Sequence, residues 1–197
     1  MRYLNKILTS LILLSLALYS DAQDVIQPDP PVLDLVTVDP ATDDVILKWL
    51  LSPSPDVEKY VIYAYENSTA HAIDTVRSAA ATEYTHTGSL AKYRSITYFM
   101  TAIDSSKNIS ILSNSLSTLF AEAVSDTCQG RIIVSWTSFV NSRHPATSYD
   151  VLCSVNGEEF EPLAALPLTQ NQYILNGYLS SVTYCFSVRA RNDAEDL

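Results

Sequence analysis

Carboxylates in the first half of the chain have a type and spacing that could bind a cation or an opposite charge. Asp39, Asp43 and Asp44 lie close together in one predicted turn, and clustered carboxylate oxygens are the ligands that Ca²⁺ takes in proteins. Arg143 and His144, in the second half of the chain, could instead form an ionic contact with this turn. The sequence leaves three possibilities open: a calcium ion, the contact with Arg143 and His144, and a solvated acidic turn without a function.

The other residues that could do chemistry do not form a known catalytic pattern. His71, His86 and His144 are expected in a turn, a fifth strand and a loop, and no two have the His-x-x-x-His spacing of metal ligands. The Gly-x-Ser-x-Gly pattern of a nucleophile elbow is absent from the sequence. The four glycines lie too far apart to build a phosphate-binding loop. We therefore predict that the chain is not an enzyme, with no catalytic, cofactor-binding or metal-binding residue and no cofactor.

The chain has three cysteines, an odd number that needs an explanation in an exported protein. The alternation of side chains points Cys153 into a core and Cys185 outward, on strands expected to be neighbours. Because a disulfide needs Cβ atoms about 4 Å apart, we predict that Cys153 is a buried free thiol. A Cys153–Cys185 bridge is the alternative. Cys128 is expected in a turn, with any partner lying beyond this sequence.

The first residues are typical of a secretory signal. Arg2 and Lys6 precede the apolar run Ile7–Tyr19, and Ser20-Asp21-Ala22 offers the small residues that a signal peptidase reads. Residues 1–22 are therefore predicted to be a cleaved signal peptide, and the protein to be secreted or held at the outer cell surface. An uncleaved anchor is the alternative, although a spanning helix needs about 20 apolar residues. No second run is long enough to span a membrane.

The net charge of −10 makes nucleic acids and anionic membrane surfaces poor partners. After a polar, proline-rich lead over residues 23–30, apolar and polar residues alternate in short segments, as they do in half-buried strands. Turn residues separate these segments every 8–12 positions, the spacing of a β-sandwich. The predicted strands of the first half are Val32–Asp39, Val45–Leu51, Val57–Glu66, Ile73–Arg77, Glu83–Thr87, Ile96–Asp104 and Ile109–Leu119.

The second half of the chain repeats the first. The pairs Trp49/Trp136, Tyr60/Tyr149, Tyr84/Tyr173 and Ala102/Ala190 are separated by 87 to 89 residues. The repeat predicts one domain over residues 31–119 and a second over residues 120–197. Only Asp193–Leu197 follow the sixth strand of the second copy, so its last strand is expected to be missing. We infer a fragment of a longer protein; the alternative is that a partner or a swapped strand fills the gap.

These residues resemble the fibronectin type III family. The resemblance rests on the tryptophan of the second strand, the tyrosine of the third and the run Thr183–Asn192 of the sixth. It implies an all-β fold of two tandem immunoglobulin-like (fibronectin type III) β-sandwiches, the second lacking its last strand. It also implies that Tyr184 is a tyrosine corner, whose hydroxyl bonds back to the preceding loop. The first copy departs here, with Ile96 at that position and Tyr98 two residues later.

Residues 31–39 and 102–110 further resemble tandem copies in large secreted surface proteins of gliding bacteria. This resemblance implies a non-catalytic secreted or cell-surface module that acts as a spacer or as a weak binder of a protein or glycan, as in adhesion. One alternative is an accessory region of a secreted hydrolase whose catalytic domain lies beyond Leu197, and another is a structural stalk without a ligand. The partner is an unknown protein or glycan at the cell surface, and the fragment is expected to be monomeric.

Overall fold

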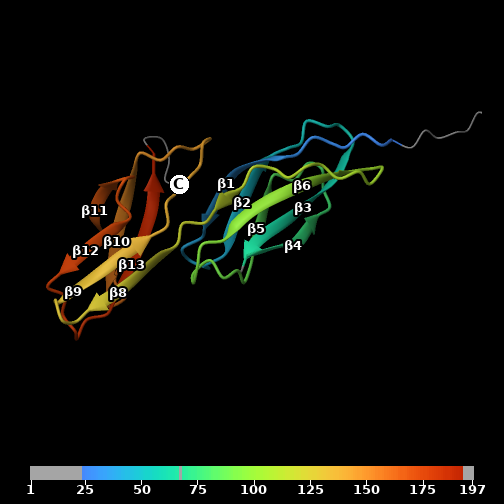
Figure 1. Cartoon of the computed structure of the whole chain (residues 1–197). Helices are drawn as coiled ribbons and strands as arrows, with labels where there is room; N and C mark the ends of the chain where they lie inside the picture. Colours follow the sequence, from blue (N-terminus) through green and yellow to red (C-terminus); the bar gives the residue numbers. More distant parts are fainter. Residues whose placement is uncertain (1–23, 67, 193–197) are drawn as a thin grey trace, which may run out of the picture.

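A computed structural model describes residues 24–66 and 68–192, and the regular structure in these residues consists of β-strands. No helix in that part of the chain is long and apolar enough to span a membrane. The predicted signal peptide and Asp193–Leu197 lie outside the described residues. Figure 1 shows the strands gathered into two units that follow one another along the chain.

The first unit is a sandwich of two antiparallel sheets. One sheet has the strand order β1-β2-β5 and the other has the order β4-β3-β6-β7. Its strands are β1 (Val32–Val38), β2 (Val45–Leu50), β3 (Val57–Glu66), β4 (Thr69–Val76), β5 (Glu83–His86), β6 (Thr97–Asp104) and β7 (Leu116–Ser117).

The second unit has the sheet orders β12-β9-β8 and β11-β10-β13. Its strands are β8 (Ala121–Asp126), β9 (Arg131–Trp136), β10 (Ser148–Val155), β11 (Glu161–Pro167), β12 (Gln172–Asn176) and β13 (Tyr184–Arg191). Among the described residues no strand lies beyond β13, whereas in the first unit β7 lies beyond β6. The predicted fold class, two sandwiches with the second lacking its last strand, is confirmed for the described part of the chain.

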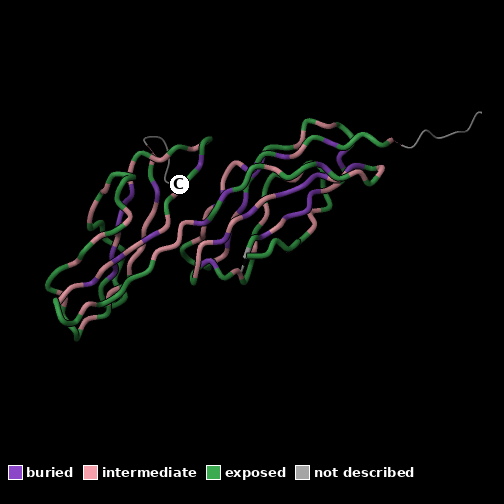
Figure 2. The backbone as a smooth tube through the Cα atoms, in the orientation of Figure 1, coloured by how far each residue is buried: buried purple, intermediate pink, exposed green. Residues whose placement is uncertain are grey.

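Each sandwich has a hydrophobic core of its own. Trp49 on β2 and Trp136 on β9 are 2% and 6% exposed. Each indole meets the ring of a tyrosine on the facing sheet edge to face, with ring centres 5.8 Å apart at Tyr60 and 5.5 Å apart at Tyr149. Figure 2 shows the buried segments along the inner strands of both units. The prediction that both tryptophans belong to the cores is confirmed.

The same strand register occurs in both sandwiches. Tyr60 lies opposite Ala102 in the first, and Tyr149 lies opposite Ala190 in the second. These four residues were markers of the sequence repeat, and all four are 1% exposed or less. The repeat in the sequence is therefore a repeat in strand pairing and in burial.

The fourth strand begins earlier than the sequence predicted. The expected strand was Ile73–Arg77, but Thr69 already pairs with the end of β3. Ser68, directly before Thr69, has a φ of 63°, in the left-handed region. β4 thus starts at Thr69 rather than at Ile73. His71, predicted in the turn, lies in this strand instead.

The last strand of the first sandwich is less regular than predicted. Of the expected strand Ile109–Leu119, β7 is the only regular part. Before it, the backbone N–H groups of Ser110 and Ser113 donate to the carbonyls of Ala102 and Met100. The two serine hydroxyls then accept from the N–H groups of the same two residues at 2.8 and 2.9 Å. Because side-chain oxygens take the place of carbonyls, the ladder is broken although the segment still covers the edge of β6.

Candidate functional site

The two sandwiches are joined by a clasp, which we define as Asp34, Asn141, Arg143 and His144. Asp34 lies on β1, and the other three lie in the loop between β9 and β10. The Nε of Arg143 donates to Oδ1 of Asp34 at 2.5 Å, and Nε2 of His144 lies 3.1 Å from Oδ2. The side-chain amide of Asn141 donates to the backbone carbonyl of Asp34 at 2.8 Å. One loop of the second sandwich therefore binds a single residue of the first with three side chains.

Asp34 carries the negative charge of the clasp. Partial burial alone would raise the pKa of its carboxyl group. The hydrogen bonds and positive charges of Arg143 and His144 outweigh that effect, so the pKa of Asp34 lies below its usual value of 3.8. The carboxylate is thus ionised, and able to hold both partners, at neutral pH.

Asn141 shapes the loop that carries the other clasp residues. Its side chain is mostly buried, and its Oδ1 accepts from the backbone N–H groups of Arg143 at 2.9 Å and His144 at 3.2 Å. Asparagine commonly organises turns by accepting from backbone groups two or three residues onward. The same amide donates to β1, so the loop conformation and the contact between the sandwiches depend on one side chain.

The connection between the sandwiches is also tied at both of its ends. Thr118 is 1% exposed; its N–H donates to the carbonyl of Ile96, and its hydroxyl accepts from the Ile96 N–H. Phe120, two residues later, exchanges two hydrogen bonds with Thr137 of the second sandwich. A short connection with both ends fixed restricts bending between the two units.

The predicted contact of Arg143 and His144 with the acidic turn is wrong in its partner. Arg143 and His144 do meet a carboxylate of the first sandwich, but it belongs to Asp34 and not to Asp39, Asp43 or Asp44. The three turn carboxylates act locally, with bonds to the backbone of Ala41 and Gly88 and an ion pair with Lys92. The acidic turn lies beyond the end of β1, whereas the loop that carries Arg143 and His144 reaches the side of that strand.

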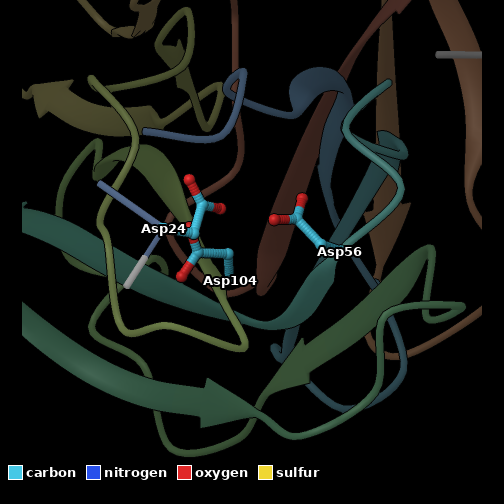
Figure 3. A group of neighbouring side chains, drawn as sticks. All are labelled: Asp24, Asp56 and Asp104. Atoms are coloured by element: carbon cyan, nitrogen blue, oxygen red, sulfur yellow. The ribbon is translucent and has the colours of Figure 1, made fainter. Parts of the chain in front are cut away.

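A second group of carboxylates meets at one end of the first sandwich, formed by Asp24, Asp56 and Asp104. One carboxylate oxygen from each lies within 4.8 Å of the others. Figure 3 shows the carboxylates of Asp24 and Asp104 close together, with that of Asp56 facing them. The residues come from the lead, the loop before β3 and the end of β6, so the fold alone brings them together. Three such oxygens could form part of the coordination sphere of a hard cation.

The buried carboxylate of this group, that of Asp104, also has a structural task. Asp104 is fully buried, and it accepts hydrogen bonds from the backbone N–H and the side-chain amide of Asn108, both at 2.8 Å. Burial alone would raise the pKa of Asp104, but the bonds from Asn108 and from the backbone of Ser106 and Lys107 lower it below 3.8. The carboxylate thus closes the turn after β6, whether or not a cation binds beside it.

A groove of about 600 Å³, with both apolar and polar side chains in its lining, lies between the sandwiches. Its first wall contains Val38 and Lys92 of the first sandwich, and its second wall contains Phe139, Phe186 and Val188 of the second. Figure 1 shows β13 on the second sandwich. The groove follows β13 and also reaches Leu152 on β10 and Phe160.

Aromatic side chains gather on the outer face of β3 and β6. The rings of Tyr63 and Phe99 stack with centres 5.4 Å apart and an angle of 9° between their planes. Tyr65, two residues further along β3, is 48% exposed. Partly exposed tyrosines are common at the centre of binding surfaces, because a rigid ring offers a large contact area at little entropic cost.

The cysteines and the predicted tyrosine corner lie where the sequence placed them. All three thiols are free: Cys153 is buried, and Cys128 and Cys185 are exposed. Burial, with a smaller contribution from the Cys185 charge, raises the pKa of the Cys153 thiol. The hydroxyl of Tyr184 accepts from the backbone N–H of Leu179 in the preceding loop at 3.2 Å, as predicted for a tyrosine corner.

The remaining histidine has a role inside the first sandwich. His86 lies at the end of β5, as predicted, and its Nδ1 is 2.9 Å from the hydroxyl of Tyr98. Sequence reasoning identified Arg143 and His144 as contact residues but missed Asp34, Asn141 and the group of Asp24, Asp56 and Asp104. The outward position of Asp34 on a strand was the available signal, and it does not specify a partner.

Comparisons with solved structures list fibronectin type III structures as similar to this chain. It is similar to the FN1–FN3 domains of chicken CNTN1, with 13% identity and a TM-score of 0.39, covering 86% of this chain and 64% of that one. A similar match is an Fn3-like protein from Clostridium thermocellum, with 19% identity and a TM-score of 0.40, covering 51% of this chain and 100% of that one.

A two-domain fibronectin type III segment of chicken tenascin is also similar. It has 16% identity and a TM-score of 0.35, and the match covers 87% of this chain and 94% of that one. No family model matches the sequence, and no curated protein matches it either. These similarities concern the fold.

Proposed function

We propose that the chain is an exported, non-catalytic module pair that acts at the cell surface as a spacer, and that its exposed faces bind a protein or glycan weakly. The observation that carries the proposal is the fixed joint between the sandwiches. A spacer must keep its two ends at a set distance, and here a short connection and a clasp hold adjacent units together.

The direct test of the spacer function is the bending between the sandwiches in solution. Small-angle X-ray scattering on the chain from Gln23 onward should give one elongated envelope that does not change with salt up to physiological ionic strength. A scattering profile that requires a wide range of angles between the units would contradict a spacer, even if both sandwiches are folded.

Export is tested separately, in cells that carry the complete reading frame. The expected result is a protein that protease added to intact cells can reach, with a mass that starts at Gln23. A protein that keeps Met1 and stays protected inside the cell would refute the proposed location but not the spacer geometry.

Weak binding is proposed for the outer face of β3 and β6, because Tyr63 and Phe99 stack there and Tyr65 is exposed beside them. A pull-down on immobilised surface glycans should retain the chain, and Tyr65→Ala should reduce retention. Tyr93→Ala is the matched control, since Tyr93 is 66% exposed on a loop of the same sandwich. Equal retention of the two variants would exclude this face, and no retention of the unchanged chain would favour a stalk without a glycan ligand.

A further inference from the structure

The outer face of the sheet β4-β3-β6-β7 differs from the matching face of the second sandwich. Tyr60 and Ala102 occupy the positions of Tyr149 and Ala190, so the outward residues of the two copies can be compared pair by pair. The cross-strand pairs of the first copy are Val61/Thr101, Tyr63/Phe99 and Tyr65/Thr97, and those of the second are Asp150/Arg189, Leu152/Ser187 and Ser154/Cys185. The first copy therefore has an uncharged, aromatic face where the second has an ion pair and two serines.

The second sandwich shows that the fold itself does not require an apolar face at these positions. There Asp150 accepts hydrogen bonds from Arg189 at 3.2 and 3.3 Å. In the first sandwich, Tyr63 and Phe99 are only partly buried and Tyr65 is 48% exposed. This sheet contains β7, so its face is not exposed because a strand is missing. Adjacent apolar side chains that the core does not need, and that stay exposed, mark a site of interaction.

The stacking of two rings leaves one aromatic face turned toward β4. The rings of Tyr63 and Phe99 lie nearly parallel, with centres 5.4 Å apart, so one face of each ring covers the other. Phe99 lies on β6, and β4 lies on the opposite side of β3 (Figure 1). The second face of the Tyr63 ring therefore points over β4. The residue opposite Tyr63 on that strand is Ala72, and the residue opposite Tyr65 is Ala70.

We call Ala70, Ala72 and the rings of Tyr63 and Tyr65 the shelf. Both alanines are exposed, and each adds only a methyl group to the surface. The shelf thus has a low apolar floor on β4 beside a taller aromatic wall on β3. β4 is the edge strand of its sheet, so no further strand of the described chain bounds the floor on its other side. The two tyrosines lie about 7 Å apart along the strand, so one short ligand segment can reach both.

Charge selects among the ligands that could stack on the shelf. Among the described outward residues of β3 from Val61 to Tyr65 and of β6 from Thr97 to Ile103, none is charged. The chain as a whole has a net charge of −10, which repels acidic glycans. A sugar ring without charge fits this surface, because its C–H groups can meet the electron-rich face of an aromatic ring while its hydroxyl groups stay in water.

We propose that the shelf binds a neutral polysaccharide, whose sugar rings stack on Tyr63 and Tyr65 and lie over the methyl groups of Ala70 and Ala72. The inference rests on the weak binding proposed for the outer face of β3 and β6, and narrows it to one ligand class and one strand. A stacked sugar ring needs the two alanines to stay small. A protein partner that covers the whole face would tolerate a larger apolar side chain on β4.

The experiment measures the migration of the chain from Gln23 onward through native gels that contain no polysaccharide, a neutral β-glucan, a neutral mannan or acidic polygalacturonate. We expect a neutral polymer to slow the chain and polygalacturonate to have no effect. Ala72→Leu should weaken this binding about fivefold, because leucine fills the place of the sugar ring and keeps the face apolar. Ala165→Leu is the matched control, since Ala165 is an exposed alanine on β11, the corresponding edge strand of the second sandwich.

NMR of the chain labelled at its alanine methyl groups locates the ligand. An oligosaccharide of the polymer that slows the chain should shift the methyl resonances of Ala70 and Ala72 in a saturable way. The resonance of Ala165 should stay in place. The same spectra show whether Ala72→Leu keeps the fold of the unchanged chain.

Some results would overturn the shelf and leave the proposed function in place. These are retardation by polygalacturonate alone, equal weakening by Ala72→Leu and Ala165→Leu, and retardation that Tyr65→Ala abolishes but Ala72→Leu does not change. A dimer in sedimentation equilibrium that Tyr65→Ala dissociates would identify a second copy of the chain as the occupant. If no polysaccharide slows the chain, both the shelf and the proposed glycan binding are wrong, while the spacer is not affected.

Discussion

Replacing Asp34 by alanine should loosen the joint between the sandwiches without unfolding either of them. The substitution removes both ion pairs of the clasp, to Arg143 and to His144, but keeps the backbone carbonyl that Asn141 binds. The side chain of Asp34 is 24% exposed and that of Arg143 is 44% exposed, so the two pairs are weak. Partly exposed ion pairs contribute about 0.2–1 kcal/mol each.

Two such pairs together stabilise the joined arrangement by about 1 kcal/mol, which corresponds to a change of about fivefold in the ratio of joined to bent molecules. The connection at Thr118 and Phe120 remains tied, so the predicted effect is a wider range of angles and not a free hinge. High salt should reproduce part of the effect in the unchanged chain, because screening weakens exposed pairs.

The assay measures the distance distribution between two spin labels, one on Cys128 and one on the cysteine introduced by Tyr93→Cys. Both positions are exposed. Cys185→Ser removes the other exposed native cysteine, so that Cys128 is the one native site that is labelled. Asp34→Ala should broaden the distribution. Glu58→Ala is the matched control, because it removes the exposed ion pair to Lys107 within the first sandwich. Equal distributions for Asp34→Ala and the control would refute the role of the clasp.

Three further predictions concern the sandwiches themselves. Trp136→Ala should lower the free energy of unfolding of the second sandwich by about 3–5 kcal/mol and unfold it. The fluorescence of Trp49 should still report a cooperative urea transition of the first sandwich. Loss of both transitions together would contradict separate cores. The lowered pKa of Asp104 stabilises the first sandwich above pH 3.8, and this stability is lost as the pH falls through the native pKa. Urea titrations should therefore show a free energy of unfolding that is constant near neutrality and falls below about pH 4, with a shallower fall in Asp104→Asn. If the pH profile of Asp104→Asn equals that of the unchanged chain, Asp104 is not the cause of the loss of stability in acid. A thiol reagent should modify two cysteines quickly in the native protein and all three in denaturant, since Cys153 is buried; a total below three would indicate a disulfide.

The strands and cores could be predicted because their signal is local. Side chains alternate across a strand, so Val45, Leu47 and Trp49 had to share one face whatever the rest of the chain did. The same reasoning separated Cys153 from Cys185. It failed where side-chain oxygens replace backbone acceptors, as at Ser110 and Ser113, because an alternating pattern does not show which oxygen accepts the bond.

The joint and the acidic group could be predicted only in part, because they depend on which loops meet in space. Charge identified Arg143 and His144 as contact residues, but their choice of Asp34 over the acidic turn follows from where the loop crosses β1. The meeting of Asp24 with Asp104 needs the course of the lead over the first sandwich, for which the sequence has no periodic signal.

Hydrogen exchange of the isolated chain, read residue by residue on β6 and β13, tests most directly whether one sandwich is present twice, closed the first time and open the second. Along β6, every amide from Tyr98 to Ala102 should exchange slowly, since both edges are paired. Along β13, slow and fast exchange should alternate, with Ser187 and Arg189 slow and the amides between and beside them fast. Uniform slow exchange on both strands, or uniform fast exchange on β13, would contradict this description of the fold.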